Sequence, residues 1–200
     1  MIKRKNILIE LIVTCFFVGK IKYAPGTFGS LLAFPLSYFV VTMTLPLGFT
    51  LNLPNINKYQ SDFFAIIVVL FAVIIALFIL GTICSSIYVK NTGREDPKEV
   101  VIDEVVGQMI VIVLGSLSVA FVHYSWLGER LGGATTDLIF LFALPFTLFR
   151  IFDIIKPFPI NWVDRKIKGG IGIMLDDVLA AIFAVVMQYA ITFVVVDFFG

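Results

Sequence analysis

Long apolar runs separated by short polar segments are the main pattern of this chain. Four runs contain no charged side chain, namely residues 23–57, 63–89, 105–128 and 178–196. A transmembrane helix needs about 20 mostly apolar residues, so each run can cross a bilayer once. A shorter run, residues 138–149, reaches that length only if Arg150 and Asp153 are included. The pattern predicts an all-α integral membrane protein with five spans, at approximately 27–48, 63–87, 104–123, 136–153 and 176–197.

The N-terminal segment at residues 7–18 is apolar but too short to cross, and Glu10 interrupts it. Basic residues precede it as in a signal peptide, but Phe16 and Phe17 stand where a cleavage site needs small residues. We therefore expect an interfacial or re-entrant helix here. Together with the five spans it forms one predicted membrane-embedded domain over residues 1–200.

The composition supports a membrane protein. Hydrophobic residues make up 60% of the 200 residues and charged residues only 14%, whereas an average soluble domain is about 25% charged. This argues against a soluble enzyme or a disordered chain. A formal net charge of +1 also provides no field to attract nucleic acid, so no nucleic-acid partner is expected. The sequence leaves the oligomeric state open.

The basic residues predict the orientation of the spans. With five spans, 13 of the 15 lysines and arginines fall on one side, and only Lys58 and Arg130 fall on the other. Short cytoplasmic loops carry an excess of Lys and Arg. The N-terminus is therefore predicted to be cytoplasmic and the C-terminus to lie outside.

Five acids stand at span ends on this predicted cytoplasmic side. Two open the third span, one closes the fourth and two open the fifth: Asp103, Glu104, Asp153, Asp176 and Asp177. Acids in membrane segments are costly and mark functional sites. Carboxylates at this density suit Mg²⁺ or Mn²⁺, so all five are candidate catalytic residues and metal ligands. The alternative is that each acid is simply hydrated at the interface.

Candidate anion-binding groups accompany these acids. Arg150 lies three positions before Asp153, and Lys156 follows just before Pro157. A Pro-Gly pair precedes Thr27, which is predicted to cap the first span, and Ser30 lies three positions on. A helix N-terminus here would present free backbone N–H groups to an anion. Phosphate held by basic groups beside a carboxylate-bound metal is typical of phosphoryl-transfer sites. A helix-end ion pair and an ordinary helix cap are the alternatives.

Taken together, these segments resemble the phosphatidylglycerophosphatase A family. The matching positions are Ala24 to Thr27, Gly29, Ser30, Asp103, Glu104, Gly107, Phe149 to Ile151, Asp153, Lys156, Pro157, Pro159, Ile160, Trp162, Asp164, Arg165, Gly169, Gly170, Gly172 to Met174, Asp176 and Asp177. The resemblance implies a Mg²⁺-dependent lipid phosphatase of the bacterial cytoplasmic (inner) membrane. Its expected substrate is phosphatidylglycerophosphate, a phospholipid within the membrane, and its expected products are phosphatidylglycerol and inorganic phosphate.

Other functions remain open from the residues alone. A small transporter or ion-coupled carrier could line its cytoplasmic mouth with acids, although transporter sites usually lie near the midplane. An assembly subunit, or a phosphatase for another phospholipid such as phosphatidate, could carry the same residues. Phosphate release from defined lipids distinguishes these possibilities.

Overall fold

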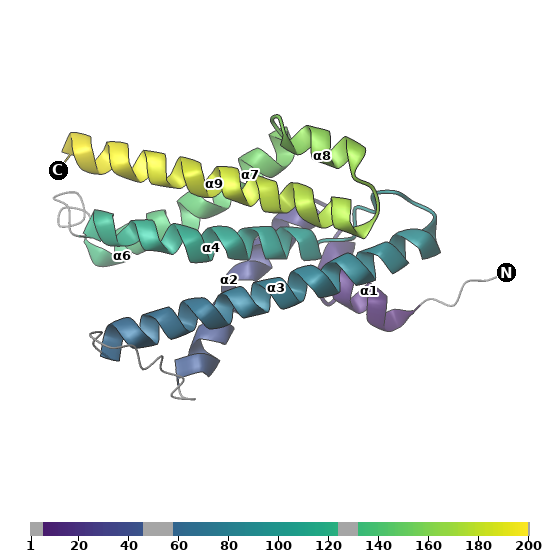
Figure 1. Cartoon of the computed structure of the whole chain (residues 1–200), viewed down its shortest axis with the longest axis horizontal. Coiled ribbons are helices and arrows are strands. Elements are labelled where there is room, and N and C mark those ends of the chain that lie inside the picture. Colours follow the sequence, from purple (N-terminus) through teal and green to yellow (C-terminus); the bar gives the residue numbers. More distant parts are fainter. Residues whose placement is uncertain (1–5, 46–57, 124–131, 200) are drawn as a thin grey trace.

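The computed structural model describes residues 6–45, 58–123 and 132–199, and every regular element in these ranges is a helix (Figure 1). The elements are α1 (Ile7–Val13), the 3₁₀ turn η1 (Val18–Lys20), α2 (Pro25–Thr44), α3 (Lys58–Thr92), α4 (Ile102–His123), α6 (Gly133–Asp137), the π-helical segment η3 (Leu138–Ala143), α7 (Leu144–Ile155), α8 (Ile160–Lys166) and α9 (Gly170–Phe199).

Within the described residues, five helical segments are long and apolar enough to cross a membrane, which confirms the predicted number of spans. They are Pro25–Thr44, Ser61–Thr92, Ile102–Val119, Gly133–Ile155 and Gly170–Phe198. Most of these helices extend beyond the predicted limits, because polar and glycine residues at their ends continue the helix. The last residues of the first predicted span, 46–48, lie outside the described residues.

Helix α4 is the centre of the bundle. It packs most extensively against α9 and also contacts α2, α3 and α7, and it runs between α9 and α3 in the view of Figure 1. Over its most apolar 18 residues it is 61% buried, whereas the corresponding window of α3 is only 17% buried. The first residues of α4 are therefore enclosed by protein, while α3 presents most of its apolar surface outward, as a lipid-facing helix does.

Small residues allow the close packing around α4. A Cβ added at Gly107 would lie 2.6 Å from ring atoms of Phe149 on α7, and one added at Gly115 would lie 2.5 Å from Oε1 of Gln188 on α9. The Gln188 amide in turn donates hydrogen bonds to the Gly115 and Phe140 carbonyls and to Ser118 Oγ. Phe140 lies in the π-helical segment, so this buried amide holds α4, η3 and α9 together at a depth where water is scarce.

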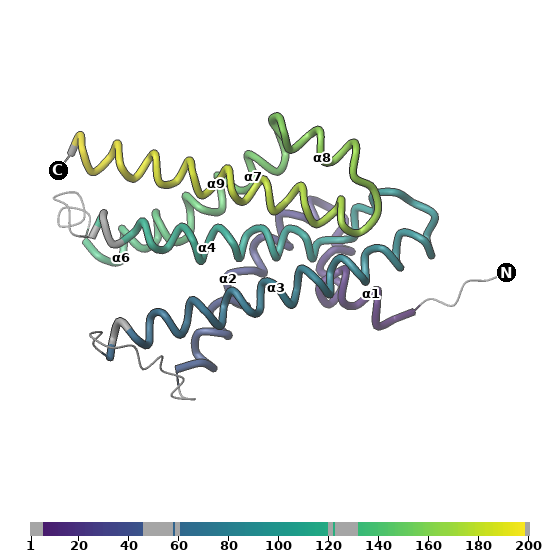
Figure 2. The backbone as a smooth tube through the Cα atoms, viewed as in Figure 1, coloured from purple at the N-terminus to yellow at the C-terminus, as the bar shows by residue number. Residues whose placement is uncertain are grey.

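The N-terminal segment folds back on itself. After α1, the chain reverses at Cys15, Phe16 and Phe17, all of which have a left-handed backbone. Figure 2 shows the reversed segment beside α3. The Val13 carbonyl accepts a hydrogen bond from the Val101 N–H at 2.9 Å, so the segment contacts the chain just before α4. A helix in this region is thus confirmed, though it ends at Val13, and its depth in the bilayer stays a prediction.

Candidate active site

The five predicted acids converge at one end of the bundle, where α1, α8 and the first turns of α4 and α9 lie (Figure 1). They line a cavity of about 380 Å³, together with Arg150 and Lys156. The sequence pattern therefore correctly identified acids from three separate helices as neighbours. The distances between their side chains depend on how α4, α7 and α9 pack.

One expectation about the acids was wrong. Asp176 and Asp177 do not open the last span, because α9 begins at Gly170 and the pair lies in its second turn. Glycine at this start lets α9 approach α3 closely, since a Cβ at Gly170 would lie 2.1 Å from the Thr82 carbonyl oxygen. This places both carboxyl groups deeper than a span end, with Asp176 only 5% exposed and Asp177 only 3% exposed.

Three of the acids form a compact group. Asp103, Glu104 and Asp177 each offer a carboxylate oxygen, and these oxygens all lie within 4.8 Å of one another. Each of the three residues also has one buried oxygen without a hydrogen-bond partner. Like charges this close in a poorly hydrated site require a compensating cation or proton. The group has the ligand chemistry of a hard divalent cation.

Asp153 and Arg150 form an ion pair on one face of α7, with Oδ2 and Nη1 2.5 Å apart. Nη1 of Arg150 also donates to Ser30 Oγ at 3.3 Å, which connects α7 to the first turns of α2. Nε of Arg150 is buried without a hydrogen-bond partner. Arg150 is therefore held in place by two residues, and part of its guanidinium is left for a ligand.

Lys156 is the second cation at the cavity. It ends α7 with a left-handed backbone and makes ion pairs with Asp164, at 2.9 Å, and with Asp176. Burial alone would lower the pKa of Lys156, but the Asp176 and Asp164 carboxylates outweigh it, and its pKa is raised. The ammonium group therefore stays charged at physiological pH.

The start of α2 differs from the predicted cap. Ala24 is the N-cap residue and Pro25 begins the helix, so Thr27 lies within the first turn and does not cap it. Neither Thr27 nor Ser30 lines the cavity. Ser30 is linked to it through Arg150 and through the Gly26 carbonyl, to which the Ser30 hydroxyl donates a hydrogen bond. Gly26 does line the cavity, and a Cβ there would lie 2.1 Å from Glu104 Oε1.

The structure adds further residues around the acids. Asp164, which the sequence placed only among the positions of the family resemblance, pairs with Lys156. The acidic and basic segment 95–98, which was not singled out from the sequence, forms one wall of the cavity. Cys15 approaches from the N-terminal reversal, where burial and the charges of Asp103 and Glu104 raise the pKa of its thiol to about 12. The charge density of segment 94–99 was the available signal for this wall.

Comparison with known proteins extends these observations. The sequence model of the phosphatidylglycerophosphatase A family matches residues 11–192. A phosphatidylglycerophosphatase A of Haemophilus influenzae is 33% identical over 92% of this chain and 89% of its own length. One of Escherichia coli is 27% identical over 91% of this chain and 82% of its own length.

The name of a third relative gives a different substrate. It is a protein of Bacteroides thetaiotaomicron named as a candidate phosphatidylinositol-3-phosphatase, 31% identical over 92% of this chain and 94% of its own length. None of these three relatives is named as a transporter, and no solved structure matches the chain. Since the family match spans both the bundle and every acid of the cavity, the chain belongs to the phosphatidylglycerophosphatase A family.

Proposed function

We propose that this protein hydrolyses the terminal phosphomonoester of phosphatidylglycerophosphate within the membrane, giving phosphatidylglycerol and inorganic phosphate. Family membership supports the substrate. The observation that supports the reaction is the group of Asp103, Glu104 and Asp177, each of which has an oxygen without a hydrogen-bond partner. Arg150 and Lys156 line the same cavity. Carboxylates and cations around one cavity suit transfer of a phosphoryl group to water.

We propose that Asp103, Glu104 and Asp177 hold Mg²⁺, with Asp153 and Asp176 at the margin of the site. The donor set fits this ion, because it consists of carboxylate oxygens and several of them lack any other partner. When bound, Mg²⁺ would neutralise phosphoryl oxygens and make a water molecule more acidic.

The chain's own residues would bind and orient the substrate. Arg150 and Lys156 bind the non-bridging phosphate oxygens, while Asp153 and Ser30 fix the guanidinium of Arg150. Water attacks phosphorus, and one of the carboxylates accepts its proton. The bond from phosphorus to the glycerol oxygen breaks, and this oxygen leaves as the alcohol after taking up a proton.

Phosphate release from purified protein, reconstituted with phosphatidylglycerophosphate, tests the proposal. Asp103→Asn and Asp177→Asn should each lower kcat by roughly 100-fold or more, because each removes a charge that acts on the reacting group. Asp197→Asn, at the exposed far end of α9, is the matched control and should retain full activity. Full activity of either site variant, or in excess chelator, would contradict the proposed metal site.

A panel of lipids tests the substrate. The Bacteroides relative makes phosphatidylinositol 3-phosphate the principal competitor, and phosphatidate represents lipids with a single phosphate. We expect the highest kcat/KM for phosphatidylglycerophosphate. A higher value for either competitor would overturn the assignment of substrate while leaving the phosphatase chemistry intact.

A further inference from the structure

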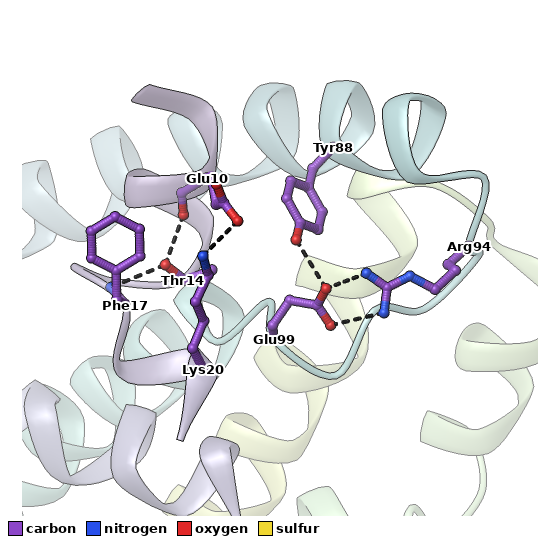
Figure 3. Close-up of polar contacts among 7 residues, drawn as sticks. All are labelled: Glu10, Thr14, Phe17, Lys20, Tyr88, Arg94 and Glu99. Atoms are coloured by element: carbon purple, nitrogen blue, oxygen red, sulfur yellow. Dashed lines mark hydrogen bonds and ion pairs between the residues drawn. The ribbon is translucent and has the colours of Figure 1, made fainter. Parts of the chain in front are cut away.

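A second cavity, of about 470 Å³, adjoins the catalytic one. The reversed N-terminal segment, the end of α3 and the segment before α4 form its walls (Figure 3). The two cavities share two lining residues, Pro25 and Lys98. A ligand could therefore extend from one into the other past these two residues.

One wall of the second cavity is fixed by Glu99. Its carboxylate accepts a hydrogen bond from Tyr88 Oη at 2.9 Å and is bound by both terminal nitrogens of Arg94 (Figure 3). Burial would raise the pKa of Glu99, but the hydrogen bonds from Arg94 and Tyr88 outweigh it, and its pKa is lowered. The backbone here is also confined, since a Cβ at Gly19 would lie 2.0 Å from the Glu99 carbonyl oxygen.

The opposite wall is fixed by Glu10 and Lys20. Lys20 Nζ lies 2.7 Å from Glu10 Oε1, and the Glu10 backbone carbonyl accepts a hydrogen bond from Thr14 Oγ1 (Figure 3). Both acids of this cavity are thus already neutralised by a basic partner. Any other lysine at the rim adds positive charge for which this cavity holds no further acid.

Two such lysines are present. Lys22 and Lys98 line the cavity, both are exposed, and within the described part of the chain neither makes an ion pair. The second cavity therefore carries four basic side chains and only two acids. The catalytic cavity has the opposite balance, with eight acids and four basic side chains.

We propose that this second cavity binds the phosphodiester of a lipid whose phosphomonoester occupies the catalytic cavity. This inference rests on the proposed function and adds a second binding site for its substrate, in which a glycerol joins the phosphodiester to the phosphomonoester. Basic pockets at the ends of transmembrane helices bind such headgroups. Phosphatidate has one phosphate and cannot occupy both cavities.

Binding of short-chain phosphatidylglycerol to the detergent-solubilised full chain, in excess chelator, tests the inference by calorimetry. This lipid has only the phosphodiester, so neither a divalent cation nor catalysis is needed. The double variant Lys22→Ala/Lys98→Ala should weaken binding roughly tenfold, since two charge-assisted contacts are lost. The matched control Arg165→Ala/Lys166→Ala removes two exposed charges of α8 that line neither cavity, and should bind as the unmodified protein does.

Inorganic phosphate distinguishes a lipid-headgroup site from a general anion site. We expect it to compete with phosphatidylglycerol only weakly, because it lacks the glycerol and acyl groups. Equal binding of phosphatidylglycerol by the double variant and the unmodified protein would overturn the inference, as would equal competition by free phosphate.

Kinetics separate this inference from the proposed function. The single variant Lys22→Ala, at a residue that lines only the second cavity, should raise KM for phosphatidylglycerophosphate roughly threefold with little change in kcat. It should leave KM for a soluble aryl phosphate unchanged. A rise in KM for both substrates would overturn the second site. If the unmodified protein releases no phosphate from any lipid, the proposed function fails, while the binding measurement still decides the phosphodiester site.

Discussion

Gly26 is the residue at which α2 comes closest to the acids. The nearest atom to an added Cβ would be Glu104 Oε1, at 2.1 Å, and the next is the carboxyl carbon of the same side chain. Since this is the end of a flexible side chain, a methyl group would displace the carboxylate and leave the backbone in place. Glycine here preserves the position of a candidate metal ligand.

We therefore expect Gly26→Ala to lower kcat/KM by at least about tenfold with little loss of stability. Phosphate release and thermal unfolding in detergent measure the two effects. Gly133→Ala, at an exposed position in the first turn of α6, is the control. Unchanged activity in Gly26→Ala would show that Glu104 can move without consequence for the reaction.

Gly19 provides a contrast in the N-terminal element. An added Cβ would lie 2.0 Å from the Glu99 carbonyl oxygen and 2.9 Å from its carbonyl carbon. These are backbone atoms, which cannot move aside without shifting the segment that leads into α4. The reversed N-terminal segment is therefore packed directly on the chain that positions Asp103 and Glu104.

Gly19→Ala should accordingly destabilise the protein, by about 1–3 kcal/mol, and lower its Tm. Phe16→Ala, at a side chain 76% exposed in the same reversal, should change Tm little when both are measured in the same detergent. An unaltered Tm for Gly19→Ala would mean that the N-terminal segment does not hold this position in the folded protein.

The ion pair of Arg94 and Glu99, in the segment between α3 and α4, predicts that the stability of the protein depends on pH. The pKa of Glu99 is lowered below its ordinary value of 4.5 on folding, so its contribution to stability is present above pH 4.5 and is lost as pH falls through the lowered pKa. Because Arg94 is largely exposed, we expect the ion pair to contribute only about 0.5–1 kcal/mol to the free energy of unfolding.

Glu99→Gln isolates this contribution. The free energy of unfolding of the variant should be lower than that of the unmodified protein at pH 7, and the difference should shrink as pH falls below 4.5. A difference that stays constant across this range would assign the effect to packing or hydrogen bonding and not to the charge of Glu99.

At the scale of the whole molecule, the basic residues gather at the end of the bundle that carries the cavity. The described ones lie at the ends of α3 and α7, in α8 and in the connections beside them, whereas Lys58 begins α3 at the other end. Since cytoplasmic segments carry an excess of Lys and Arg, we expect the cavity to face the cytoplasm and the C-terminus to lie outside. Lys3, Arg4, Lys5 and Arg130 lie outside the described residues.

Cysteine labelling in intact bacterial cells measures this orientation. In a background with Cys15→Ser and Cys84→Ser, a membrane-impermeant maleimide should label Asp197→Cys in intact cells. It should label Lys168→Cys only after the membrane is permeabilised. Labelling in the opposite order would reverse the orientation and place the cavity outside the cytoplasm.

The sequence by itself determined the all-helical class, the five spans and the set of acids. Charge-free runs of sufficient length have few alternatives to a transmembrane helix, because an unpaired backbone is too costly in lipid. Acids such as Asp103 and Asp177 stand out for the same reason. A polar residue in a membrane segment is rare, so the local sequence pattern alone is enough to identify it.

Only the tertiary structure decided how these residues combine. It distinguished the group of Asp103, Glu104 and Asp177 from the neighbouring Asp153 and Asp176, which form ion pairs with Arg150 and Lys156. Two helix starts also differ from the predicted ones. The N-cap of α2 is Ala24 and not Thr27, and α9 begins earlier, at Gly170. The start of α2 follows locally from Pro25, which suits the first helical position. The grouping of the carboxylates and the start of α9 depend on contacts between segments far apart in the chain, where the absence of a Cβ allows one helix to approach another. No local pattern of hydrophobic and polar residues contains that information.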